Sequence, residues 1–124
     1  MKKKYLIVIA DYYKDISKGL LDSALKRIPI SNSIKIIKVP GVFEIPITIS
    51  KNIKKYDAFL ALGCVIKGET PHFDFISLAS TNAIMDLSIS YKKPIGNGII
   101  TCLNMRQAKA RKKKGAEAAE AVIS

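Results

Sequence analysis

The hydrophobic pattern of the chain alternates between apolar runs and segments with helical spacing. Residues 4–10, KYLIVIA, and residues 58–65 are near-continuous apolar runs. Such runs are typical of strands buried on both faces of a parallel sheet, whereas half-exposed strands alternate apolar and polar residues. Residues 34–39 and 95–102 predict two further strands, and Pro40-Gly41 ends the first of these. Gly96 and Gly98 indicate a bulge or a close backbone approach in the last strand.

The segments between the strands carry the spacing of amphipathic helices. Apolar residues recur every three or four positions from Ile16 onward, with charged residues on the opposite side. Asn104 is a good N-cap for the fourth helix, and Gly115 is expected to separate it from the last one. The later helices are predicted over residues 43–52, 73–90, 105–114 and 116–123. Right-handed crossovers between parallel strands then give an α/β fold, a three-layer αβα sandwich around a four-stranded parallel sheet.

The segment after residue 65 breaks the apolar run and has the features of a ligand-binding turn. Thr70 before Pro71 favours a helix start, which puts His72 in the first helical turn. Parallel sheets bind ligands beyond the carboxyl ends of their strands, where a helix N-terminus offers N–H donors to an anion. Gly68 would let the backbone approach closely, and the helix dipole favours a neutral imidazole that can accept a proton. The pattern predicts a phosphate site beside a base; a capped helix with a surface histidine is the alternative.

Length and composition predict one globular domain covering residues 1–124. The 124-residue chain is 48% hydrophobic and 25% charged, so a packed core is expected. No apolar run has the length of a membrane span, and the first residues lack a secretory cleavage site, which predicts a cytoplasmic protein without a membrane partner. Cys64 and Cys102 lack metal-ligand spacing, so we interpret both as buried small hydrophobes and expect no metal site.

The positive charge of the chain, +11 with a pI near 9.8, raises the hypothesis of a nucleic-acid ligand. Lysines are, however, spread over the whole sequence, and the longest unbroken basic run is residues 111–114. No aromatic platform accompanies that run, as it would in a protein that stacks bases. We therefore expect no nucleic-acid partner and keep a basic nucleic-acid-binding module as the less favoured alternative.

Four blocks, residues 10–16, 39–46, 63–75 and 98–117, together resemble the 6,7-dimethyl-8-ribityllumazine synthase family. VPGVFEIP and LGCVIKGETPHFDF are similar to its two most diagnostic motifs. The resemblance implies a flavodoxin-like fold without a metal or redox cofactor. It implies condensation of 5-amino-6-(D-ribitylamino)uracil with 3,4-dihydroxy-2-butanone 4-phosphate to 6,7-dimethyl-8-ribityllumazine, releasing phosphate and water. An assembly or shell protein of the same fold with impaired catalysis is the alternative.

The resemblance also assigns roles to individual residues. Tyr12 would stack on the pyrimidine, and His72 matches the proposed proton carrier. The rest of the uracil and ribityl pocket would be formed by Val42, Phe43, Glu44 and the backbone of Cys64, Val65 and Ile66. The loop that binds the butanone phosphate would be Gly68, Glu69 and Thr70.

The C-terminal block adds cations and implies an oligomer. Arg111 matches a phosphate-binding arginine, whose guanidinium suits phosphate geometry, and Lys114 a second phosphate contact. Glu117 would orient Arg111, while Lys112 and Lys113 are expected to be solvated. In the family the site lies between subunits of a pentamer or a 60-subunit shell, so Asn97 and Arg111 would reach substrates bound by the neighbouring chain. Asn97 replaces the phenylalanine of many relatives, and the connection after Arg111 is shortened.

Asn104 and Gln107 also match family positions, but the sequence assigns them no role in the site.

Overall fold

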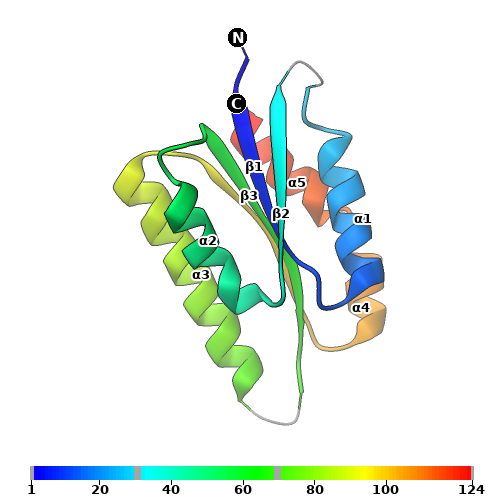
Figure 1. Cartoon of the computed structure of the whole chain (residues 1–124). Coiled ribbons are helices and arrows are strands. Elements are labelled where there is room, and N and C mark those ends of the chain that lie inside the picture. The colour runs from blue at the N-terminus through cyan, green and yellow to red at the C-terminus, as the bar shows by residue number, and fades with distance from the viewer. Residues whose placement is uncertain (1, 30–31, 69–70, 124) are drawn as a thin grey trace.

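The computed structural model describes residues 2–29, 32–68 and 71–123. Four parallel strands form one sheet in the order β2-β1-β3-β4. Helices α2 and α3 cover one face of this sheet, and α1 and α5 cover the other (Figure 1). The three-layer α/β architecture predicted from the sequence is therefore confirmed. The elements are β1 (Lys4–Ala10), α1 (Lys14–Leu25), β2 (Ser33–Val39), the 3-10 turn η1 (Val42–Glu44), α2 (Ile45–Asn52), β3 (Ala58–Ile66), α3 (His72–Tyr91), β4 (Ile95–Cys102), α4 (Met105–Ala110) and α5 (Lys114–Ile123).

The two interior strands, β1 and β3, contribute side chains to two separate hydrophobic cores. Side chains of β1 alternate between them: Tyr5, Ile7 and Ile9 face the core with α1 and α5, and their neighbours face the core with α2. Strand β3, in register with β1 from Tyr5↔Ala58 onward, divides its side chains in the same way. Because both faces are covered, neither strand needs polar positions, and this explains the uninterrupted apolar runs.

The prediction for the C-terminal helices was wrong in its boundaries. Helix α4 ends at Ala110 rather than at residue 114, and α5 begins at Lys114, so Gly115 lies inside α5 instead of separating two helices. The reason is a contact distant in sequence: a Cβ on Gly115 would lie 2.0 Å from the carbonyl oxygen of Leu20. Gly115 therefore permits α5 to lie directly against the backbone of α1.

The remaining element boundaries differ little from those predicted. A 3-10 turn precedes α2, and α3 starts at His72 with Pro71 as its N-cap. The close approach expected in β4 is present, because a Cβ on Gly96 would lie 2.2 Å from the carbonyl oxygen of Ala118 in α5. The predicted capping role of Thr70 lies outside the described residues.

Candidate functional site

A pocket of about 350 Å³ lies at the carboxyl ends of β1 and β3, beside the first turn of α3. Most residues that the sequence assigned to the pyrimidine subsite, and the candidate base, meet in it. Its lining is Tyr12, Tyr13, Gly41, Val42, Cys64, Val65, Ile66, His72 and Ile76. Segments far apart in the sequence, from Tyr12 to Ile76, thus converge because parallel strands end at the same edge of the sheet.

Tyr12 presents its aromatic ring to this pocket with 75% of its surface exposed. Tyr13 supports it edge-on, with ring centroids 4.9 Å apart and an interplanar angle of 84°. The turn that carries both rings is fixed by Ser17, which is buried and whose hydroxyl donates to the carbonyl oxygen of Ala10 at 2.7 Å. This geometry leaves an aromatic face open to a flat heterocycle.

Phe43 and Glu44 do not line the pocket at the strand ends, although Val42 does. They line a mostly apolar hollow of about 430 Å³ between α2 and α3, together with Pro46, Ile47 and Ala83 among others. Their sequence-predicted contact with the uracil substrate therefore stays a prediction.

His72 lies in the first helical turn, as the sequence predicted: it is the first residue of α3, and it is exposed. In the same first turn, the backbone N–H groups of Asp74 and Phe75 donate to the carbonyl oxygen of Pro71 at 3.1 and 3.2 Å. A Cβ on Gly68 would meet no atom within 4 Å, so the protein itself leaves open space there. Glu69 and Thr70 lie outside the described residues, and the phosphate-binding role of the loop stays a prediction.

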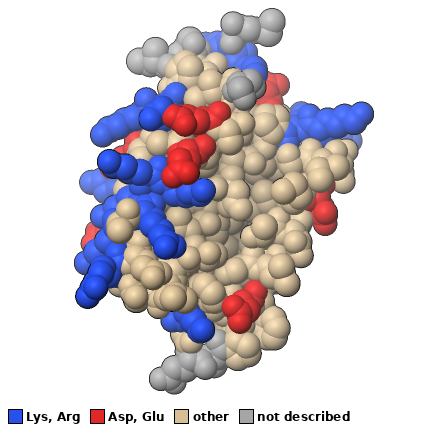
Figure 2. Space-filling view, turned by 180° about the vertical axis from the view of Figure 1, so that it is seen from behind, with Lys and Arg blue, Asp and Glu red and all other residues tan. Residues whose placement is uncertain are grey.

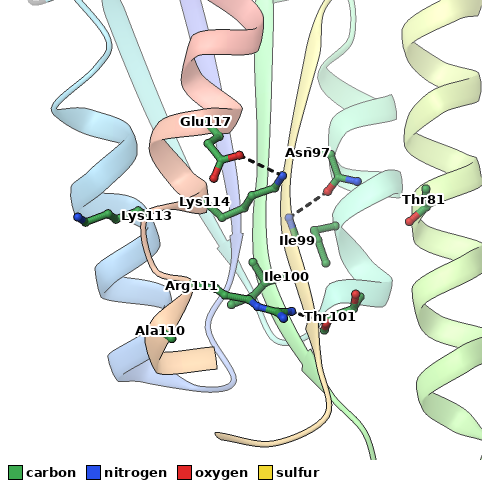
Figure 3. A pocket seen from close by; sticks show the side chains of 10 residues that line it. All are labelled: Thr81, Asn97, Ile99, Ile100, Thr101, Ala110, Arg111, Lys113, Lys114 and Glu117. Atoms are coloured by element: carbon green, nitrogen blue, oxygen red, sulfur yellow. Dashed lines mark hydrogen bonds and ion pairs between the residues drawn. The ribbon is translucent and has the colours of Figure 1, made fainter. Parts of the chain in front are cut away.

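The candidate phosphate cations line a second pocket, of about 670 Å³, along the free edge of β4 (Figure 3). Arg111 donates from Nη1 to the carbonyl oxygen of Thr101 at 3.4 Å. Lys114 Nζ lies 3.6 Å from Glu117 Oε1, so the described ion pair of Glu117 is with Lys114, and its orienting role toward Arg111 stays a prediction. Asn97 Oδ1 accepts from the backbone N–H of Ile99 at 2.9 Å.

The two pockets share no residue among those described. The first combines an aromatic ring with a histidine at a helix N-terminus, and the second combines an arginine and two lysines with one carboxylate. The resemblance assigned both groups to one site formed between neighbouring subunits, and within a single chain they line separate pockets.

Asn104, the N-cap predicted from the sequence, and Gln107 secure the start of α4. Asn104 Oδ1 accepts from the backbone N–H of Gln107 at 2.9 Å, and Gln107 Oε1 accepts from that of Leu103 at 2.8 Å. These bonds satisfy N–H groups at the helix start and fix the turn between β4 and α4. Lys112 is half-buried rather than fully solvated, because its aliphatic stem packs against Gly19.

Burial raises the pKa of the Cys64 thiol to about 12, and the adjacent Cys102 adds to this shift. Burial, followed by the nearby Cys64, also raises the pKa of Tyr13 above its usual value. Both groups stay protonated near neutral pH, so the pocket wall is chemically inert and the sequence interpretation of the two free, buried cysteines is confirmed. Among the described residues no three His, Cys, Asp or Glu side chains are grouped to hold a metal ion.

Comparison with known proteins identifies the family. The family model described as 6,7-dimethyl-8-ribityllumazine synthase matches residues 2–124. A protein of that name from Methylorubrum populi is 44% identical, over 98% of this chain and 79% of its own length. The chain belongs to the 6,7-dimethyl-8-ribityllumazine synthase family.

Other members of the 6,7-dimethyl-8-ribityllumazine synthase family are similar over nearly the whole chain. The protein named 6,7-dimethyl-8-ribityllumazine synthase 1 from Rhodopseudomonas palustris is 42% identical, over 98% of this chain and 82% of its own length. The synthase from Agrobacterium fabrum is 41% identical, over 100% of this chain and 93% of its own length. Among the described residues, no helix is long and apolar enough to cross a membrane.

Proposed function

We propose that this chain condenses 5-amino-6-(D-ribitylamino)uracil with 3,4-dihydroxy-2-butanone 4-phosphate to 6,7-dimethyl-8-ribityllumazine, releasing phosphate and water. This is the penultimate step of riboflavin biosynthesis, and we assign it to the cytoplasm. The observation that carries the proposal is the pocket at the strand ends, where the open ring of Tyr12 and the imidazole of His72 face one cavity in a chain of this family.

The chemistry requires positioning and proton transfer. Condensing an amine with a ketone releases water, and expelling phosphate breaks a C–O bond, so both steps need protons moved at the reacting atoms. In this proposal Tyr12 stacks on the pyrimidine, the backbone of β3 near Val65 holds its edge, and His72 transfers the protons. A positioned acid or base contributes about 10² to 10⁴ in rate, and holding two substrates together contributes as much or more. We expect the loss in His72→Ala at the small end of the first range.

Direct measurement of product formation tests the activity. Purified protein mixed with both substrates should give the visible absorption of the lumazine product. A stable oligomer that binds neither substrate would favour the impaired shell protein instead. Salt-sensitive retention of a random oligonucleotide, without turnover, would favour the basic nucleic-acid-binding module.

The separate pockets support a site completed by a neighbouring subunit. Arg111, Lys114 and Asn97 would reach the substrates bound at the strand ends of the next chain in a pentamer or a 60-subunit shell. A face suited to such contact exists on α3, where four large apolar side chains are each more than half exposed: Phe75, Leu78, Met85 and Ile89. In Figure 2, Lys and Arg side chains gather mainly at the left of the view, where α1, α4 and α5 lie. Few charged side chains are seen at the right, toward α3. Exposed apolar area of this kind supports association of copies of the chain.

Mixed oligomers test the shared site. Chains carrying Arg111→Ala and chains carrying His72→Ala each have one defect, and the two defects fall on different sides of the proposed interface. In a ring assembled at random from equal amounts, about a quarter of the sites would then receive both intact residues. Activity should reach about a quarter of the parent value, well above the average of the two variants.

A matched mixture supplies the control for this experiment. His72 and Tyr12 line the same pocket of one chain, so mixing His72→Ala with Tyr12→Leu cannot rebuild a complete site. That mixture should stay at the average of its two components. If the Arg111 and His72 mixture also stays at its average, with co-assembly verified by native mass spectrometry, the shared site is refuted.

A further inference from the structure

The connection between α4 and α5 is short and carries the candidate phosphate cations. Helix α4 ends at Ala110 and α5 begins at Lys114, so Arg111 lies at one end of the connection and Lys114 at the other. Backbone bonds tighten the turn: the N–H of Arg111 donates to the carbonyl oxygen of Ala108 at 3.1 Å, and the N–H of Lys114 to that of Arg111 at 3.0 Å. The directions of both cations therefore depend on how this turn is held.

Ser23, on α1, holds the turn from outside. Its Oγ lies 3.0 Å from the carbonyl oxygen of Lys112 and accepts from the backbone N–H of Ala116 at 3.1 Å. The same hydroxyl lies 3.0 Å from the carbonyl oxygen of Leu20 in its own helix. A hydroxyl has one hydrogen and two lone pairs, so it can donate to one carbonyl while accepting from the amide. One half-buried side chain thus contacts the backbone on both sides of Lys114.

Two glycines bring the turn close enough for these bonds. A Cβ on Gly115 would lie 2.0 Å from the carbonyl oxygen of Leu20 and 2.6 Å from Ser23 Oγ. On the opposite side, a Cβ on Gly19 would lie 2.5 Å from Cδ of Lys112. The turn therefore lies directly on α1, and Ser23 is the polar group at this contact.

We propose that Ser23 is a positioning residue, which acts through the backbone of residues 112–116 to direct Arg111 and Lys114 toward the phosphate group of the substrate. The inference rests on the proposed phosphate-binding role of Arg111. It explains how a shortened connection keeps its cations in place, because α1 supplies the support that a longer loop would otherwise provide. Ser23 touches no substrate and takes no part in proton transfer.

The test compares three serine variants of the full chain. Ser23→Ala removes the hydroxyl, and Ser23→Thr keeps it. Ser88→Ala is the matched control, because the hydroxyl of Ser88 is also half-buried and donates to a main-chain carbonyl, that of Lys93 at 2.7 Å, at the other end of the molecule from the turn. For each variant we would measure the dissociation constant of inorganic phosphate by calorimetry, the KM of each substrate, the oligomer mass and the Tm.

Ser23→Ala should weaken phosphate binding and raise the KM of the butanone phosphate by about three- to tenfold, the range of one lost hydrogen bond. The KM of the pyrimidine should not change. Ser23→Thr should restore at least half of the lost affinity, and Ser88→Ala should lower Tm without altering phosphate affinity.

Three results would overturn the inference. Phosphate affinity that is unchanged in Ser23→Ala but reduced in Arg111→Ala would leave the phosphate site standing and remove the role of Ser23. If Ser23→Ala and Ser88→Ala weaken phosphate binding equally, Ser23 only stabilises the fold and has no specific effect on the phosphate site. If Arg111→Ala itself leaves phosphate affinity unchanged, the proposed phosphate site is wrong and the role of Ser23 falls with it.

Discussion

Replacing Gly96 by alanine tests the contact between β4 and α5. The added Cβ would lie 2.2 Å from the carbonyl oxygen of Ala118 and 2.9 Å from its carbonyl carbon. Contacts of Cβ below 3.0 Å are essentially never seen in proteins, so the two backbones must separate by about 1 Å. Because the obstructing atoms belong to the main chain, no side-chain rotation can relieve the contact.

The cost of Gly96→Ala follows from what α5 buries. Ala118, Ala119 and Val122 of this helix are each at most 3% exposed, and they close the core over β1 and β3. Inserting a methyl group into a well-packed core costs about 1 to 3 kcal/mol, and we expect the upper end because the helix must move as a unit. Lys114 and Glu117 move with α5, so affinity for the butanone phosphate should fall as well.

Urea unfolding followed by circular dichroism measures this loss. Parent and variant should be compared at the same protein concentration, since association would contribute to the measured stability. Gly68→Ala is the control, because a Cβ there would meet nothing within 4 Å, and its free energy of unfolding should stay within about 0.5 kcal/mol of the parent. If Gly96→Ala also stays within that limit, α5 is not held rigidly against β4 and the reasoning fails.

Two further predictions concern the pocket at the strand ends. Tyr12→Leu should weaken pyrimidine binding by about 1 kcal/mol and leave phosphate binding unchanged in calorimetry, because it removes an aromatic contact; equal weakening of both ligands would show that Tyr12 supports the fold instead. Burial raises the pKa of Cys64 from 9.0 to about 12, so its contribution to stability is present below pH 9 and is lost as pH rises toward 12. Cys64→Ala should therefore lose less stability between pH 8 and 11 than the parent, and an identical decline in both would refute the assignment.

The sheet and its helical layers were predictable because their signals are local. The runs around Ile7 and Leu60 are apolar because helices cover both faces of these strands. Burial on both faces can therefore be predicted from the sequence of each strand alone. Helix α3 ends with Lys92 in the left-handed conformation as its C-cap, two residues before Pro94, and a proline shortly after a helix is likewise a local signal.

The features that the sequence could not predict depend on distant contacts. The glycine at position 115 predicts a helix end, but Gly115 lies within α5. A glycine is needed there because the backbone of Leu20 in α1 occupies the space that a Cβ would fill. The hydroxyls of Ser17 and Ser23 look like ordinary helix-surface groups until their partners, Ala10 and Lys112, are seen.

The candidate site was predicted in part. Tyr12, the end of β3 and His72 were expected together, because parallel strands end at one edge, and they do line one pocket. Arg111 was expected, by resemblance alone, to reach the site of a neighbouring chain. Within its own chain it lines a different pocket, along β4, and its contact with a neighbour stays a prediction.

The packing of α5 on α1 has a consequence for how the chain acquires its structure. Residues Lys114–Ile123 cover the side chains of β1 and β3 that point away from α2, and they are synthesised after all four strands. While the chain grows, Tyr5, Ile7 and Leu60 therefore have only one of their two covering helices. Such transiently exposed apolar surface promotes aggregation. Slow synthesis through residues 105–113 would prolong this vulnerable interval, and changes that hasten the docking of α5 should raise the yield of native protein more than they raise its equilibrium stability.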